Sequence, residues 1–145
     1  MNIDRNGVAL LAQLEGLVLK PYLCANNVPT IGLGNTYYAN GKKVKMTDPP
    51  ITKEQAYDLF YMIAPDFESA VNELVESRLN QHQFNALFCF CYNIGYPRWK
   101  KSTLLRMVNE NPDGRDKITA AFLLWKGRKN LLLSRQVAQI NEYFK

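Results

Sequence analysis

The stretch from Phe84 to Ile94 constrains the fold more than any other part of the sequence. Its apolar residues occur on every side of a helix rather than in one stripe: Phe84, Ala86, Leu87, Phe88, Cys89, Phe90, Cys91 and Ile94. A helix that is apolar all round has to be covered by other parts of the chain. We therefore predict that residues 84–94 form the central core helix.

Helical periodicity runs from residue 53 to the end of the chain. Breaks are predicted near Pro65, Leu79-Asn80, Gly95, Pro112-Asp113-Gly114 and Gly127. The final segment, Ser134 to Phe144, is amphipathic through Val137, Ile140 and Phe144, and we expect it to pack on the core helix.

The first part of the chain has a different pattern. Val8, Leu11 and Leu14 mark one face of a short helix that Asp4 can cap and Gly16 ends, which leaves Glu15 in its last turn. Residues 17–46 then alternate Tyr, Val, Thr and Ile with Gly and Asn, and turns are expected at Asn26-Asn27 and Asn40-Gly41. This indicates a small antiparallel sheet, and Thr52 with Gln55 forms a capping box that opens the next helix.

The fold class is therefore α+β, in a single domain over residues 1–145. The first helix and a β lobe occupy residues 1 to about 50, and a helical lobe occupies about 51–145. The chain has 145 residues, of which 47% are hydrophobic and 21% charged, so it can bury one core without disulfides.

Charge and cysteine content restrict the partners and the redox setting. The net charge of +5 favours an anionic partner, such as nucleic acid, anionic lipid or an acidic cell wall. The basic runs Arg98–Lys101 and Lys126–Lys129 match no nucleic-acid motif and are interpreted as solvated surface charge. Three cysteines, an odd number, indicate reduced thiols, with Cys89 and Cys91 buried in the core helix. No metal or cofactor is expected, and the single histidine, His82, is interpreted as structural.

The most informative motif begins at Glu15-Gly16. Tyr22 follows seven residues after the glutamate, and the run Thr30-Ile31-Gly32-Leu33-Gly34-Asn35-Thr36 comes next. These residues closely resemble the active-site region of phage-type lysozymes, glycoside hydrolase family 24. Two further blocks are similar to the same family: Gln83–Leu87 leading to Tyr92–Gly95, and Ser102–Leu105. The resemblance covers residues 5 to 125, and more loosely the rest of the chain.

The resemblance implies a lysozyme-like fold with an active-site cleft between the two lobes. It also implies a catalytic set of a Glu, then an Asp or Cys, then a Thr, which Glu15, Cys24 and Thr30 match in spacing. Asn35 departs from the His common at its position in the family, so a charged pairing made by that His is not carried over. Tyr22, Gly32 and Asn35 are candidates for substrate binding.

Physical reasoning gives roles to the three catalytic candidates. Cleavage of a glycosidic bond needs an acid to protonate the leaving oxygen and a second group to attack or to position water. Glu15 suits the acid, and Thr30 can orient a water. Cys24 can activate a water, form a transient thioglycoside or shape the water site, and the sequence leaves these three open.

The hairpin also has to place the candidates correctly. A turn around Asn26-Asn27 with an odd loop of three or five residues makes Cys24 and Thr30 directly opposed, with both side chains on one face of the sheet. A loop of two or four residues would put them on opposite faces. Tyr22, Trp99 and Trp125 can stack on sugars, although large aromatic residues are more often part of the core.

These inferences predict an endolysin, a lysozyme (N-acetylmuramidase) that hydrolyses the β-1,4 bond between N-acetylmuramic acid and N-acetylglucosamine in peptidoglycan. The alternative is a peptidoglycan-binding protein of the same fold with impaired catalysis, and a nucleic-acid-binding helical module is a third reading. The amino terminus lacks the pattern of a secretory signal. We therefore expect a monomer that waits in the host cytoplasm, depends on a holin-like pore protein and acts on the wall in the periplasm, with no stable membrane insertion.

Overall fold

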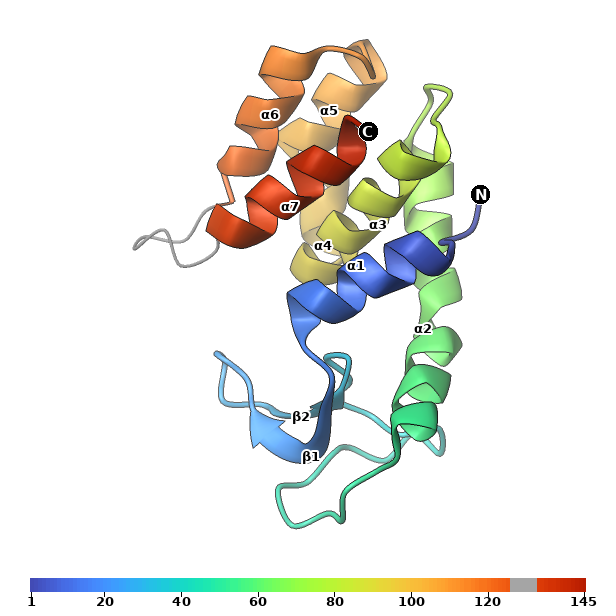
Figure 1. Cartoon of the computed structure of the whole chain (residues 1–145), viewed down its shortest axis with the longest axis vertical. Helices are drawn as coiled ribbons and strands as arrows, with labels where there is room; N and C mark the ends of the chain where they lie inside the picture. Colours follow the sequence, from blue (N-terminus) through green and yellow to red (C-terminus); the bar gives the residue numbers. More distant parts are fainter. Residues whose placement is uncertain (126–132) are drawn as a thin grey trace. The chain divides into compact units, whose positions relative to one another are not determined.

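The computed structural model of the chain describes residues 1–125 and 133–145 (Figure 1). The predicted break at Gly127 and the basic run Lys126–Lys129 lie outside the described residues. The elements follow in this order: α1 (Arg5–Glu15), β1 (Val18–Leu23), β2 (Pro29–Gly32), α2 (Lys53–Leu74), α3 (Gln81–Ile94), α4 (Tyr96–Lys100), α5 (Thr103–Glu110), α6 (Arg115–Leu123) and α7 (Leu133–Tyr143). One small antiparallel sheet with a helical majority confirms the predicted α+β class.

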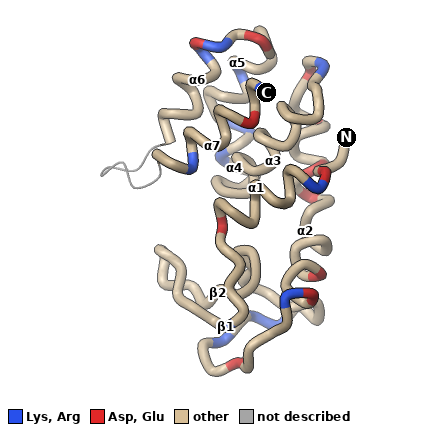
Figure 2. The backbone as a smooth tube through the Cα atoms, in the orientation of Figure 1, with Lys and Arg blue, Asp and Glu red and all other residues tan. Residues whose placement is uncertain are grey.

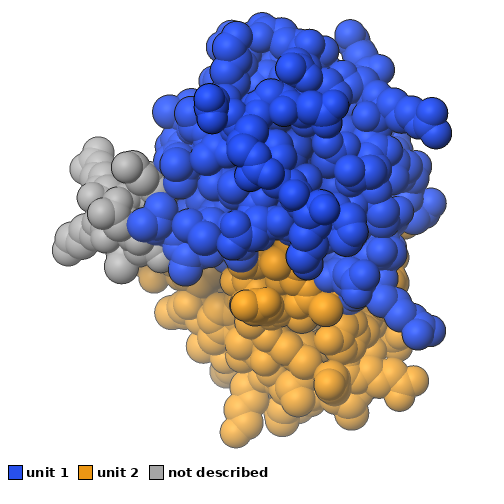
Figure 3. Space-filling model, turned by 45° about the horizontal axis from the view of Figure 1, so that its top comes forward, with its two compact units in different colours: residues 1–8, 66–145 blue, residues 9–65 orange. Residues whose placement is uncertain are grey.

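The described residues form two compact units, which Figure 3 colours separately. One comprises residues 1–8 and 66–145, and the other comprises residues 9–65. Among the described residues, no helix combines the length and the apolar character needed to cross a membrane. Lysine and arginine are dispersed along the backbone, as Figure 2 shows.

Helix α3 is the core of the larger unit, as predicted from its sequence. Nine consecutive residues, Gln83 to Cys91, are buried. Asn80 caps the helix with a complete capping box, and Gly95 ends it with a φ of 84°. Phe90 meets Trp99, Phe122 and Trp125 edge to face. Trp99 is 0% exposed and its indole N–H donates to the carbonyl of Ala70, so this tryptophan belongs to the core.

Helix α7 packs on α3, which confirms that prediction, but the buried face of α7 is not the expected one. Of the three residues expected to face inward, Val137 is exposed and Ile140 and Phe144 are half-buried. The fully buried residues of α7 are largely polar: Gln136, Gln139, Glu142 and Tyr143. The apolar periodicity was misleading because polar contacts fix the rotation of the helix. Gln136 donates to the Trp125 carbonyl and the Tyr143 hydroxyl donates to the Pro112 carbonyl.

The predicted break at Pro65 is wrong, since Pro65 lies inside α2. A proline removes one backbone donor and crowds the carbonyl four residues earlier, that of Tyr61. Pro65 and Tyr61 are both exposed. Water can therefore bond the freed carbonyl, and the helix continues. The predicted breaks near residues 79–80, 95 and 112–114 are confirmed as helix boundaries.

Replacing Glu142 by Gln is expected to lower the free energy of unfolding by about 1–2 kcal/mol at neutral pH. The Glu142 side chain is 5% exposed and pairs with His82 at 3.0 Å and with Lys145 at 2.8 Å. Burial opposes its ionisation, but the hydrogen bonds from Lys145 and His82 together lower the pKa of Glu142. His82 thus makes a structural contact, as the sequence indicates.

The pH dependence of that loss is the diagnostic measurement. A carboxyl group with a lowered folded-state pKa stabilises the fold above its unfolded pKa, and this is lost as pH falls through the folded pKa. Urea unfolding should therefore show the gap between wild type and Glu142→Gln closing below about pH 4. Glu73→Gln, at an exposed position of α2, is the matched control and should show no gap. A gap that persists in acid would contradict the assignment.

Candidate active site

The carboxyl group of Glu15 lies at the end of α1, as the sequence predicts. The amide of Gly16 donates to the carbonyl of Ala12, and Gly16 has a φ of 74°. This left-handed glycine ends the helix and turns the chain towards β1. Glu15 is half-buried rather than on an open helical face.

The hairpin of β1 and β2 corrects the predicted register. The loop holds three residues, 25–27, because Cys24 and Val28 close it and Asn27 adopts a φ of 58°. An odd loop and a shared face for Cys24 and Thr30 were predicted, and both are present. Their direct opposition was wrong, since Thr30 opposes Tyr22. Cys24 and Thr30 are therefore diagonal neighbours across the two strands. A loop that ran from residue 25 to residue 29 would place Cys24 directly opposite Thr30, but this loop ends at Asn27.

Cys24 is held by hydrogen-bond donors that favour its thiolate. Backbone N–H groups of Asn26 and Val28 lower the pKa of Cys24, and they outweigh the opposing effect of burial. The thiol is partly exposed, whereas Cys89 and Cys91 are buried, and all three are free cysteines. The thiol at the site is thus the one disposed to ionise.

Thr30 is 3% exposed, and its hydroxyl lies 2.8 Å from the carbonyl of Val28, to which it donates. With its proton used there, the hydroxyl oxygen keeps a lone pair that can accept a hydrogen from water. Thr30 is therefore fixed in orientation by the backbone of its own hairpin.

Tyr22 connects the glutamate to the hairpin electrostatically. Burial raises the pKa of Tyr22, and negative charge on Glu15 and on Cys24 raises it further. Both anionic groups therefore lie within electrostatic range of one phenol. The three predicted catalytic residues and Tyr22 all belong to the unit of residues 9–65.

Gly32 and Asn35 are placed for packing. Gly32 has a φ of 70°, and a Cβ added there would lie 3.5 Å from that of Ala56. Asn35 is 4% exposed and its amide donates to the carbonyl of Leu59 at 3.3 Å. Neither Gly32 nor Asn35 exposes much surface to a substrate. We therefore infer that both residues maintain the conformation of the loop after β2.

The backbone N–H groups of Asn26 and Val28 are functional groups that sequence reasoning missed. Their direction depends on the conformation of residues 25–27 and not on side-chain identity. The one available signal was the Asn26-Asn27 pair, which tolerates a positive φ. Among the described residues, no group of three or more His, Cys, Asp or Glu could hold a metal ion.

Iodoacetamide is expected to modify Cys24 in the native protein and to leave Cys89 and Cys91 unmodified. Cys89 and Cys91 are 0% exposed, and burial raises the pKa of Cys91 to about 12. The rate of Cys24 modification should follow a pH midpoint below that of a cysteine in the unfolded chain. Peptide mass spectrometry across a pH series measures it.

Labelling of the unfolded chain is the matched comparison for this measurement, because it keeps the three thiols and removes the backbone donors at Cys24. The same labelling in denaturant should reach all three thiols. A native midpoint equal to that in denaturant would contradict the proposed environment of Cys24.

Comparison with known proteins bears on this arrangement. The sequence profile of the family described as phage lysozyme matches residues 12–139. An endolysin of Salmonella phage P22 is 36% identical over 126 residues, which cover 87% of this chain and 84% of that protein.

Solved structures give the same result. The endolysin from Escherichia coli O157:H7 phage FAHEc1 matches with a TM-score of 0.88 and 29% identity, covering 100% of this chain and 94% of that chain. A crystal structure of a P22 lysozyme mutant matches with a TM-score of 0.82 and 33% identity, covering 100% of this chain and 99% of that chain.

Proposed function

Because this chain belongs to the phage lysozyme family and is a peptidoglycan-hydrolysing endolysin, we propose that Glu15, Cys24 and Thr30 carry out its glycosidic cleavage. The bond proposed is the β-1,4 linkage between N-acetylmuramic acid and N-acetylglucosamine. The main support for the proposal is that Cys24 and Thr30 share one face of the hairpin. Tyr22 lies opposite Thr30, and the negative charge of Glu15 raises the pKa of its phenol.

Glu15 acts as the general acid in this scheme. Its proton goes to the oxygen of the leaving sugar as the bond to the anomeric carbon breaks. The helix end at Gly16 fixes the backbone of Glu15, and its half-buried position reduces contact with solvent. Glu15 finishes the step as a carboxylate and regains its proton from solvent.

Cys24 and Thr30 act together on the attacking water. The Thr30 hydroxyl donates to Val28, so towards water it is an acceptor, and the Cys24 thiolate is an acceptor as well. A water that gives one hydrogen to each has its oxygen lone pair free to attack the anomeric carbon. The water's proton passes to the sulfur, which loses it to solvent after the products leave.

Tyr22 is proposed to contact the sugar beside the acid, since it lies opposite Thr30 and is partly exposed. Gly32 and Asn35 contribute through the loop that they shape. The cleft between the two lobes, expected from the resemblance, and the absence of a cofactor remain predictions.

Release of soluble muropeptides from purified peptidoglycan tests the function. Wild type should release them with new reducing ends at muramic acid, as mass spectrometry of borohydride-reduced products would show. A protein that sediments with the wall but releases nothing would instead be the wall-binding alternative. New reducing ends at glucosamine would contradict the proposed bond.

The route to the wall is the remaining proposal. We expect a monomer that accumulates in the host cytoplasm and reaches peptidoglycan through a holin-like pore. Light scattering coupled to size exclusion measures the first property. Fractionation of expressing cells, with and without a pore-forming protein, measures the second, and lysis without any pore would contradict it.

A further inference from the structure

A basic pocket lies in the unit of residues 9–65. The residues that line it fall between positions 38 and 55, later in the sequence than Glu15, Cys24 and Thr30. Its volume is about 480 Å³, and its lining includes Lys42, Lys43, Lys45, Asp48 and Gln55. Glu15, Cys24 and Thr30 do not line it. The three lysines are exposed.

The backbone that carries the lysines is fixed by a second hairpin. Tyr37 pairs with Lys43, and Gly41, with a φ of 78°, donates to the carbonyl of Tyr38. Val44 is 3% exposed and packs in a cluster with Ile31 and Leu59. Since Val44 points inward, Lys43 and Lys45 on either side of it point outward.

One carboxylate lies among these cations. Asp48 accepts hydrogen bonds from the Tyr38 hydroxyl and from the Lys45 backbone N–H, each at 2.8 Å. The Lys45 N–H and the Tyr38 hydroxyl lower the pKa of Asp48, so it stays ionised. Among the ion pairs of the described residues, none involves Lys42, Lys43 or Lys45. Three positive charges thus face one negative charge that is already hydrogen-bonded.

Two side-chain amides add oriented donors. The amide oxygen of Asn40 accepts the Lys42 N–H, and that of Gln55 accepts the Thr52 N–H, each at 2.9 Å. Their NH₂ groups take part in no hydrogen bond among the described residues. With its acceptors occupied, the pocket offers mainly ammonium and amide donors, which suit an oxyanion.

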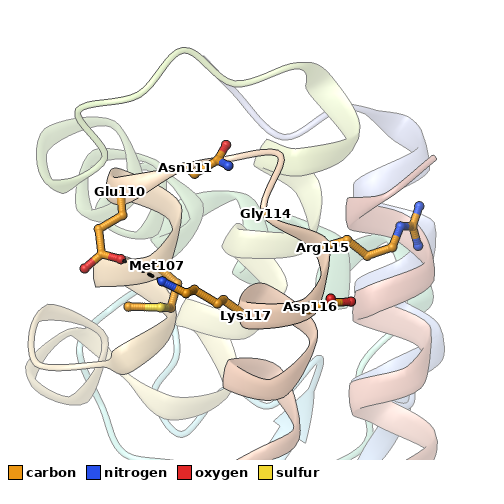
Figure 4. Close-up of a pocket in the computed structure, with 7 residues that line it drawn as sticks. All are labelled: Met107, Glu110, Asn111, Gly114, Arg115, Asp116 and Lys117. Atoms are coloured by element: carbon orange, nitrogen blue, oxygen red, sulfur yellow. Dashed lines mark ion pairs between the residues drawn. The ribbon is translucent and has the colours of Figure 1, made fainter.

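A pocket in the other unit provides a contrast (Figure 4). Its charges balance: Lys117 pairs with Glu110 at 3.9 Å, Arg115 lies over the ring of Phe144, and Asp116 lies beside them. No excess charge is left there for an ion. The pocket at Lys42, Lys43 and Lys45 differs from this second pocket in its excess of positive charge.

We propose that the pocket at Lys42, Lys43 and Lys45 binds phosphate groups of an anionic cell-envelope polymer and so holds the enzyme at its insoluble substrate. Lysine binds phosphate as a point charge and does not require a fixed planar geometry in the ligand. The proposal rests on the wall-degrading function, but phosphate binding is separate from the cleavage chemistry. It can therefore be measured in a Glu15→Gln background.

The test compares two triple variants with the same loss of charge. In one, Lys42, Lys43 and Lys45 are changed to Gln; in the other, the exposed Lys100, Lys101 and Lys117 are changed to Gln. Titration calorimetry with poly(glycerol phosphate) and with lipopolysaccharide identifies the source of the phosphate. We expect wild type to bind at least one polymer, the first triple variant to bind it at least about tenfold more weakly and the second to change little.

A second measurement uses the unmodified sequence. Inorganic phosphate should shift the backbone amide resonances of residues 38–55 selectively. The proposal is overturned if wild type binds neither polymer, if both triple variants lose affinity equally, or if phosphate shifts resonances across the whole chain. Loss of cleavage by wild type would leave these results unaffected and would count against the proposed catalytic function alone.

Discussion

Glu15→Gln should lower the rate of muropeptide release by about 10³-fold. Glutamine keeps the size of the side chain but has no acidic proton to give to the leaving oxygen. The half-buried position of Glu15 at the helix end means that solvent does not easily replace it as the acid. Release of reducing ends from purified peptidoglycan measures the rate, and sedimentation with the same material measures binding.

Asp58→Asn is the matched control for Glu15→Gln. Asp58 is an exposed carboxylate of α2 in the same unit, so its replacement removes the same charge from that unit. It should keep near wild-type activity, and Glu15→Gln should still sediment with the wall. Retention of more than a tenth of wild-type activity by Glu15→Gln would contradict its role as the acid.

Local signals in the sequence predicted the parts of the site that depend on neighbouring residues. Asp4 caps α1 through its side chain, Gly16 ends the helix, and Thr52 with Gln55 forms the capping box before α2. Each device operates within a few residues, so spacing alone is enough to place it. Glu15 could be located from the sequence for this reason.

Features set by backbone direction or by distant contacts were predicted less well. The expected odd number of loop residues was enough to put Cys24 and Thr30 on one face of the hairpin. Which residues are directly opposed depends on the turn at Asn27, whose backbone is left-handed. The buried face of α7 depends on partners far along the chain, such as His82 and Pro112. The sequence pattern of α7 contains no information about those partners. Its apolar stripe therefore predicted the wrong buried face.

Cys24→Ala should lower the rate by about 10²-fold, and Cys24→Asp should retain most of it. Alanine removes the acceptor for the attacking water, whereas aspartate supplies an acceptor at the same place on the hairpin. The N–H groups of Asn26 and Val28 remain available to the aspartate carboxylate, whereas alanine has no atom that can accept them. Initial rates of muropeptide release compare the three proteins. An Ala variant as active as wild type would show that the thiol is incidental.

The proposed role of Cys24 also predicts how activity changes with pH. The thiolate is the active form in the proposed scheme, so wild-type activity should rise as pH increases through the lowered pKa of Cys24. In Cys24→Asp this rise should move to much lower pH, because an aspartate ionises near pH ~4. An unchanged rising limb in Cys24→Asp would mean that it belongs to another group.

Product stereochemistry separates the thioglycoside role of Cys24 from the two roles in which a water attacks the sugar directly. Attack by a positioned water inverts the anomeric carbon, whereas a thioglycoside formed on sulfur and then hydrolysed retains its configuration. The Thr30 hydroxyl, turned towards Val28, supports a bound water beside the sulfur, so inversion is expected. Proton NMR of the first products, before the anomers equilibrate, decides between them. Retention together with a covalent mass increase on the Cys24 peptide would make sulfur the nucleophile.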